Sequence, residues 1–167
     1  MANITLDGIP VETIGTLPEV GSQIKDFKLV ATNLSIKTLA NFLGNNLIMN
    51  IFPSIKTGVC SASIRRFNEL ASKLDNTKIL CISRDLPFSQ QQYCAAEGLD
   101  NVIMLSDYKE GAFGKNYGLI MVNGAFDALL SRCIIVADNS GKIIYTEQVP
   151  DIGQEPDYES ALDALKS

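Results

Sequence analysis

Two apolar runs with an amphipathic segment between them constrain the fold of this chain more than any other feature. Residues 47–52 (LIMNIF) form a nearly continuous apolar run, and residues 78–83 (KILCIS) form a second one. Such runs are typical of strands in the middle of a sheet. Between them, Ile64, Phe67 and Ala71 recur at the spacing of one helix face. This order predicts two parallel strands joined by a crossover helix, and therefore an α/β fold.

The rest of the chain adds strands and helices around this unit. Short extended runs at 3–6 and 11–13, joined by the turn at 7–10, predict an N-terminal β-hairpin. Alternating apolar residues predict a half-buried strand over 26–31. The other predicted elements are helices over 38–43, 88–97, 109–115 and 158–165, and strands over 102–105, 132–138 and 142–147. Because no repeat or low-complexity tract interrupts the pattern, we expect one domain over residues 1–167.

Size, composition and charge exclude several classes of protein. A chain of 167 residues with 46% hydrophobic residues can bury a core, so a disordered chain is excluded. The net charge of −5 argues against a nucleic-acid partner, which needs a basic face. No apolar run approaches the roughly 20 residues of a membrane helix. The N-terminus has no basic segment before an apolar one, so we expect no secretory signal, no membrane partner and a cytoplasmic protein.

The chain has no histidine and four cysteines, which narrows the chemistry. Without histidine, Ser-His-Asp and Cys-His catalysis and most zinc and non-haem iron sites are excluded. No two of Cys60, Cys81, Cys94 and Cys133 form a C-x-x-C pair. We therefore expect no metal and no cofactor. Reactive or buried thiols remain, because structural disulfides are rare in a reducing cytosol.

Cys60 lies where the first strand of the central unit leads into its helix. The unpaired N–H groups of a helix N-terminus carry partial positive charge, which favours thiolate over thiol. Thr57 is a plausible N-cap, which would make Cys60 the third helical residue. The alternative is that Cys60 is a small buried hydrophobic residue, as many free cysteines are.

Pro53, Thr57 and Cys60 match the pattern P-x-x-x-T-x-x-C, and with the surrounding sequence the chain resembles the thiol peroxidase branch of the peroxiredoxins. The resemblance covers nearly the whole chain. It extends to NIFPSI at 50–55, CIS at 81–83, DLPF at 85–88, AEGL at 96–99 and EPDYE at 155–159. It implies a thioredoxin-like fold, with a central mixed sheet flanked by helices plus the N-terminal β-hairpin. One departure is Lys56, where this branch typically has aspartate.

The resemblance implies a catalytic role for each residue of the motif and for one distant arginine. Cys60 would be the peroxidatic cysteine, whose thiolate attacks a peroxide and becomes a sulfenic acid. Thr57 would orient the peroxide, and Pro53 would form a wall that keeps water away. The family's arginine corresponds to Arg132, whose cation cannot be lost. From the residues alone, Thr57 could be only an N-cap, Pro53 only the end of a strand, and Arg132 an exposed residue at a strand edge.

The second cysteine of the mechanism is also implied by the resemblance. Cys94 would be the resolving cysteine, which forms an intramolecular disulfide with Cys60 that thioredoxin reduces. Because both cysteines fall on predicted helices, we expect local unwinding when the disulfide forms. Cys81 and Cys133 are predicted to be packing residues. The family also implies a homodimer.

Three functions follow from these residues. The first is a thioredoxin-dependent peroxidase that reduces hydrogen peroxide and organic hydroperoxides. The second is a redox-sensing or chaperone-like binding protein that uses the same cysteine pair as a switch. The third, a disulfide oxidoreductase, is disfavoured because C-x-x-C is absent. The sequence does not rank the hydroperoxides, identify the reductant or assign a role to Lys56.

Overall fold

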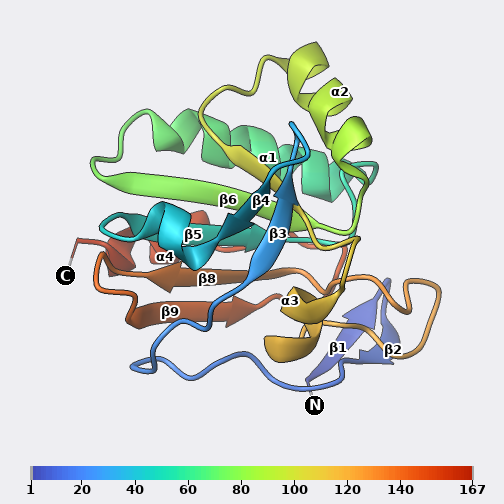
Figure 1. Ribbon diagram of the computed structural model, residues 1–167. Coiled ribbons are helices and arrows are strands. Elements are labelled where there is room, and N and C mark those ends of the chain that lie inside the picture. The colour runs from blue at the N-terminus through green and yellow to red at the C-terminus, as the bar shows by residue number, and fades with distance from the viewer. Residues whose placement is uncertain (1, 167) are drawn as a thin grey trace.

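The computed structural model describes residues 2–166, which form one large sheet, a separate two-stranded sheet and four α-helices (Figure 1). The small sheet pairs β1 (Asn3–Leu6) with β2 (Ile9–Glu12), as the predicted hairpin requires. The large sheet contains β3 (Lys28–Ala31), β4 (Ile36–Thr38), β5 (Asn46–Ile51), β6 (Thr77–Ser83), β7 (Ile103–Ser106), β8 (Cys133–Ala137) and β9 (Ile143–Gln148). The helices are α1 (Gly58–Ala71), α2 (Pro87–Glu97), α3 (Ala112–Asn116) and α4 (Tyr158–Ala164).

The large sheet is mixed and has the strand order β4-β3-β7-β6-β5-β8-β9. The three central strands β5, β6 and β7 are parallel, and the outer strands pair antiparallel. Strand β5, helix α1 and strand β6 form the predicted crossover unit. The predicted thioredoxin-like architecture is therefore confirmed, with helices flanking a central mixed sheet.

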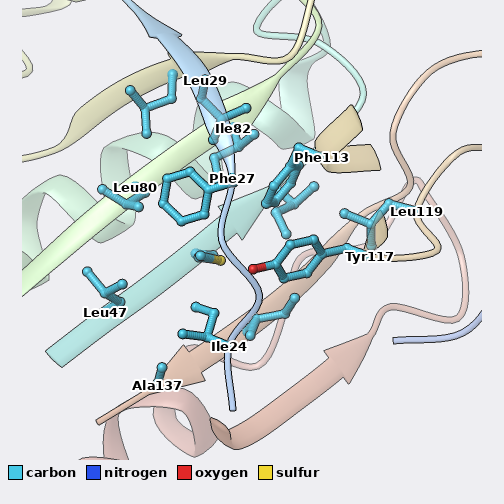
Figure 2. Packing of buried hydrophobic residues seen from close by; sticks show 14 of the residues in the cluster. Ile24, Phe27, Leu29, Leu47, Leu80, Ile82, Phe113, Tyr117, Leu119 and Ala137 are labelled. Carbon is cyan, nitrogen blue, oxygen red and sulfur yellow. The ribbon is translucent and has the colours of Figure 1, made fainter. Parts of the chain in front are cut away.

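The sheet separates two apolar clusters because alternate side chains of each strand point to opposite faces. One cluster lies under α1 and α4 and contains Cys60, Phe67 and Leu162. The other cluster includes Phe27, Phe113 and Tyr117, and Figure 2 shows these aromatic rings grouped with aliphatic side chains from the sheet. Alternation along β8 puts Cys133 in this second cluster and Ile134 in the first.

The predicted helix over 38–43 is wrong in part. Residues Ile36–Thr38 form β4, an edge strand paired with β3, and only Leu39–Phe42 are helical, as the 3₁₀ helix η1. The extended conformation of residues 36–38 depends on pairing with β3. The local spacing of apolar residues carries no information about that pairing. The predicted helix over 109–115 is also shifted, since α3 begins at Ala112 after Gly111, whose φ of 69° only glycine adopts readily.

Local signals place the two helices that carry the candidate cysteines. Helix α1 begins directly after its N-cap Thr57, and α2 has Pro87 in its first turn. Gly98 ends α2 in the left-handed conformation, as its sequence position predicts. Within residues 2–166, no helix combines the length and apolar character needed to cross a membrane.

Candidate active site

Cys60 lies in the first turn of α1, close to the carboxyl end of β5. Its backbone N–H donates to Oγ1 of Thr57 at 3.2 Å, which confirms Thr57 as the N-cap and Cys60 as the third helical residue. A cap of this kind stabilises a helix by about 1 kcal/mol. The Cys60 side chain is fully buried in the α1 face of the core. The loop and the cap therefore hold the sulfur at one position near the positive end of the helix.

Arg132 reaches the sulfur from a part of the chain 72 residues away. Its Nη2 donates to Sγ of Cys60 at 3.1 Å, and its Nε donates to the carbonyl oxygen of Ile152 at 2.8 Å. The two residues meet because β5 and β8 are antiparallel neighbours, with Ile51 opposite Cys133. Arg132 immediately precedes β8 and so lies beside the chain as it leaves β5. The alternative of an exposed arginine at a strand edge is wrong, since only 1% of Arg132 is exposed.

The electrostatics of this contact are unusual for a buried cation. Within residues 2–166, the salt bridges involve Arg66, Arg84 and Lys166, and none involves Arg132. Nη1 of Arg132 is buried and has no hydrogen-bond partner there. A buried guanidinium is costly unless a negative group compensates it. The arrangement therefore suits negative charge on the Cys60 sulfur, or on a ligand atom beside it.

A pocket of about 110 Å³ opens next to these groups. Arg132 and the first residues of α1 form one side, and apolar side chains from three other segments form the rest. Its lining residues are Leu6, Thr57, Gly58, Val59, Phe126, Arg132, Ile152 and Gly153. Pro53 is buried and is not among these lining residues. Cys60 is fully buried and is not among them either, so the pocket can hold a small molecule with an apolar part and a polar end near Arg132.

The N-terminal hairpin supports this pocket. This role of the hairpin was not predicted from the sequence. Thr5 donates through Oγ1 to the Asp151 carboxylate at 2.5 Å, and the Ile152 N–H donates to the Thr5 carbonyl at 2.8 Å. These bonds hold the loop whose Ile152 carbonyl accepts from Arg132. The hydrogen bond from Thr5 is the main reason that the pKa of Asp151 lies below its usual value. No local pattern in the sequence joins positions 5 and 151.

Cys94 lies on α2 and packs against the same apolar cluster as Cys60. Both thiols are free, and each belongs to an intact helix. Burial, and secondarily the charge of Asp100, raises the pKa of Cys94 to about 11. In this state Cys94 is therefore a protonated, partly buried thiol.

The other two cysteines have no access to solvent. Cys81 is buried on β6, where Asn50 makes a weak hydrogen bond to its sulfur at 3.8 Å, and burial raises its pKa to about 12. Cys133 is buried on the opposite face of the sheet from Cys60. Both are packing residues, as predicted. Lys56 and Arg65 are exposed.

Among residues 2–166, no cluster of three or more cysteine, aspartate, glutamate or histidine side chains could hold a metal ion.

The sequence and the fold have close counterparts among known proteins. The Redoxin family model matches residues 19–162. The thiol peroxidase of Corynebacterium glutamicum is 44% identical over 165 residues, which cover 99% of both chains. That of Streptococcus sanguinis is 47% identical over 163 residues, 98% of each chain.

The chain belongs to the redoxin family. Its identity of 44% and 47% to these two relatives, over nearly the whole of each chain, places it in the thiol peroxidase branch of the peroxiredoxins. The chain is therefore a thiol-dependent peroxidase. The resemblance on the 53–60 motif is thus confirmed at the level of the family and of the enzyme class.

Solved structures agree with the fold of this peroxiredoxin. A peroxiredoxin-like protein from Aquifex aeolicus superposes with a TM-score of 0.93 at 28% identity, over 99% of this chain and 96% of that one. A thiol peroxidase from Chromobacterium violaceum superposes with a TM-score of 0.91 at 20% identity, over 98% and 95% of the two chains. The second likeness concerns the fold alone.

Proposed function

We propose that this peroxiredoxin reduces hydrogen peroxide and organic hydroperoxides through a Cys60 sulfenic acid and a Cys60–Cys94 disulfide. The observation that carries the proposal is the buried Arg132 guanidinium, which donates to the Cys60 sulfur and has no carboxylate partner within residues 2–166. A thiolate at Cys60 would compensate the cation. The same guanidinium can stabilise the oxygen that leaves during peroxide cleavage.

The first step oxidises Cys60. Its thiolate attacks the terminal oxygen of the hydroperoxide, so an S–O bond forms while the O–O bond breaks. The sulfur becomes a sulfenic acid, and the leaving oxygen takes up a proton and departs as water or an alcohol. Thr57 and Arg132 line the pocket and also contact Cys60, which supports roles in orienting the peroxide. Leu6 and Phe126 support binding of an alkyl group. Pro53, buried in the loop between β5 and α1, is proposed to keep water from the sulfur.

The second step joins the two cysteines. The Cys94 sulfur attacks the sulfenic sulfur of Cys60, an S–S bond forms and water leaves. Cys60 is fully buried, and each cysteine belongs to an intact helix, so α1 and α2 are expected to unwind locally. A dithiol protein such as thioredoxin then reduces the disulfide and returns both thiols.

Replacing each cysteine tests these two steps separately. We expect Cys60→Ser to abolish peroxide consumption with thioredoxin, thioredoxin reductase and NADPH. Cys94→Ser is expected to keep one stoichiometric turnover and to lose further turnovers with thioredoxin. Cys133→Ser is a matched control on the opposite face of the sheet, for which we expect activity close to that of the parent protein.

Peptide mass spectrometry after one equivalent of peroxide identifies the paired cysteines. A Cys60–Cys94 crosslink is the expected product. Sustained peroxide consumption by Cys60→Ser, or a disulfide that excludes Cys94, would contradict the mechanism. A disulfide that forms without steady-state turnover would instead indicate a redox switch.

We also propose a domain organisation, an oligomeric state and a cellular location for the enzyme. The N-terminal hairpin contributes Leu6 to the pocket, which supports one domain over residues 1–167. A homodimer in the cytoplasm is proposed on the family resemblance and on the need for a thiol reductant. Sedimentation of the reduced protein at micromolar concentration tests the dimer, and a monomer there would exclude it.

A further inference from the structure

Asp85 lies at a junction that the peroxidase mechanism above does not use. Strands β5 and β6 are parallel neighbours, with Ile51 beside Ile82, so the segments that leave their carboxyl ends run side by side. Asp85 follows the end of β6 by two residues and faces the loop between β5 and α1. Its carboxylate accepts from the Ser54 hydroxyl at 2.7 Å and from the Ile55 N–H at 2.9 Å.

A chain of hydrogen bonds continues from this loop to Cys60. The Ser54 carbonyl accepts from the backbone N–H of Thr57 at 3.3 Å and from its Oγ1 at 3.4 Å. Because this bond uses the Thr57 hydroxyl proton, the oxygen lone pairs remain for the Cys60 N–H, which donates to it at 3.2 Å. The position of the N-cap, and with it the first turn of α1, therefore depends on how Ser54 is held.

The same carboxylate is connected to the helix of Cys94. The Ser83 hydroxyl donates to Asp85 at 2.6 Å and accepts from Nε2 of Gln90 at 3.3 Å. Gln90 also donates to the Leu105 carbonyl at 3.0 Å. It lies on α2 one turn before Cys94, and it is one of only two residues of that helix that are buried, the other being Pro87.

We propose that Asp85 is a positioning residue that anchors the loop between β5 and α1 directly and α2 through Ser83, so that the stability of each segment depends on the other. The proposal rests on the proposed function, since the loop leads into the helix of Cys60 and α2 carries Cys94. Three donors converge on the two carboxyl oxygens, and hydrogen bonds to a charged group are the stronger kind. When α2 unwinds, its bond to Ser83 is lost, and the loop that holds Thr57 is weakened with it.

Kinetics of Cys60 test the positioning role. In Asp85→Ala, the second-order rate constant for peroxide is expected to fall about 10- to 100-fold, because small displacements of a reacting group cost this much. Alkylation of Cys60 by iodoacetamide is expected to stay equal or to rise, because the thiol needs no oriented peroxide and becomes less buried. Asp85→Asn keeps one carbonyl oxygen as an acceptor. Its rate constant for peroxide is expected to lie between those of the parent protein and Asp85→Ala. Urea unfolding of each variant measures how much folded protein is present.

Two outcomes would overturn the positioning role. One is a parallel loss of peroxide reduction and alkylation that follows the folded fraction, since this would reflect general destabilisation. The other is an unchanged rate constant for peroxide in Asp85→Ala.

Hydrogen exchange tests the coupling without any measurement of activity. Ser54→Ala is expected to speed amide exchange in α2, and Gln90→Ala to speed exchange over residues 54–60, each by about tenfold for one lost hydrogen bond to the charged network. Gln92→Ala, exposed on the same helix, is the matched control and is expected to leave residues 54–60 unchanged. Exchange that changes only next to each substitution would overturn the coupling.

The two kinds of failure can be told apart. If the parent protein does not consume peroxide, the proposed function fails, while the hydrogen-exchange result still decides the coupling. If the parent consumes peroxide and exchange shows no reciprocal effect, only the coupling through Asp85 fails.

Discussion

Arg132 is the residue on which the site depends most clearly. It is buried, it donates to the Cys60 sulfur, and its Nε is held by the Ile152 carbonyl. A guanidinium keeps its proton at any working pH, whereas a histidine would titrate near neutrality. In a chain without histidine, arginine therefore supplies a cation and a fixed donor in one side chain.

Arg132→Met separates catalysis from stability at this position. We expect the rate constant for peroxide to fall about 10²- to 10³-fold, as when one donor to a developing charge is removed. The free energy of unfolding is expected not to fall, because burying a cation costs several kcal/mol that the similarly sized methionine avoids. Competition kinetics against a reference peroxidase and urea titration measure the two quantities. Arg65→Met, exposed on α1, is the control. A rate constant within about threefold of the parent value would contradict the proposed role, because loss of such a donor costs much more than that.

Helix α2 keeps the Cys94 thiol partly buried while it is folded. Only Pro87 and Gln90 of this helix are buried, so few contacts oppose its opening. In the folded helix, burial holds the pKa of Cys94 at about 11, and an opened segment would return it toward the ordinary value near 8.5. Local unwinding would therefore bring Cys94 to Cys60 and also make more of it thiolate.

A titration of Cys94 tests this property of α2. The thiolate absorbance at 240 nm is compared between Cys60→Ser and the double variant Cys60→Ser/Cys94→Ser, so that their difference isolates Cys94. We expect little signal below pH 9 and an inflection near pH 11. Adding Asp100→Asn is expected to move the inflection lower, since the Asp100 charge contributes to the shift. An inflection near pH 8.5 would mean that Cys94 is already solvated in the folded protein.

For the whole molecule, the buried thiols contribute to the dependence of stability on alkaline pH. Burial raises the pKa values of Cys81 and Cys133 far above that of a thiol in the unfolded chain. The folded state then keeps protons that the unfolded state releases. Below about pH 8.5 their contribution to stability is fully present, and it is lost as pH rises toward the folded pKa, which for Cys81 is about 12.

Cys81→Ala is expected to flatten this dependence. Well above pH 8.5, each such thiol lowers the free energy of unfolding by about 1.4 kcal/mol per pH unit. The variant should be less stable than the parent at pH 7 because of the cavity, and the difference should shrink between pH 9 and 10.5. Urea titrations across this range, with a phosphine reductant present, measure it. A constant difference between parent and variant would contradict the burial of the Cys81 thiol.

The extent of sequence-based prediction differs between fold and site. The β5–α1–β6 unit, the N-terminal hairpin and the N-cap Thr57 follow from patterns within a few residues, and all are observed. Strand β4 was missed because its conformation depends on pairing with β3. The role of Arg132 was predicted from the family resemblance. The local sequence around Arg132 was equally compatible with an exposed side chain. No sequence pattern indicated the contacts of Leu6 and Asp85, because these contacts are made by distant segments.

By itself, the sequence determined a Cys60 that begins a helix after a buried strand, a threonine cap one turn before it, and the absence of histidine as a base. The tertiary structure decided what surrounds that sulfur. Antiparallel pairing of β5 with β8 brings Arg132 to it, and parallel pairing of β5 with β6 brings Asp85 to the preceding loop. The physical reason is that local propensities act over one or two turns, whereas strand order and register determine which distant side chains meet.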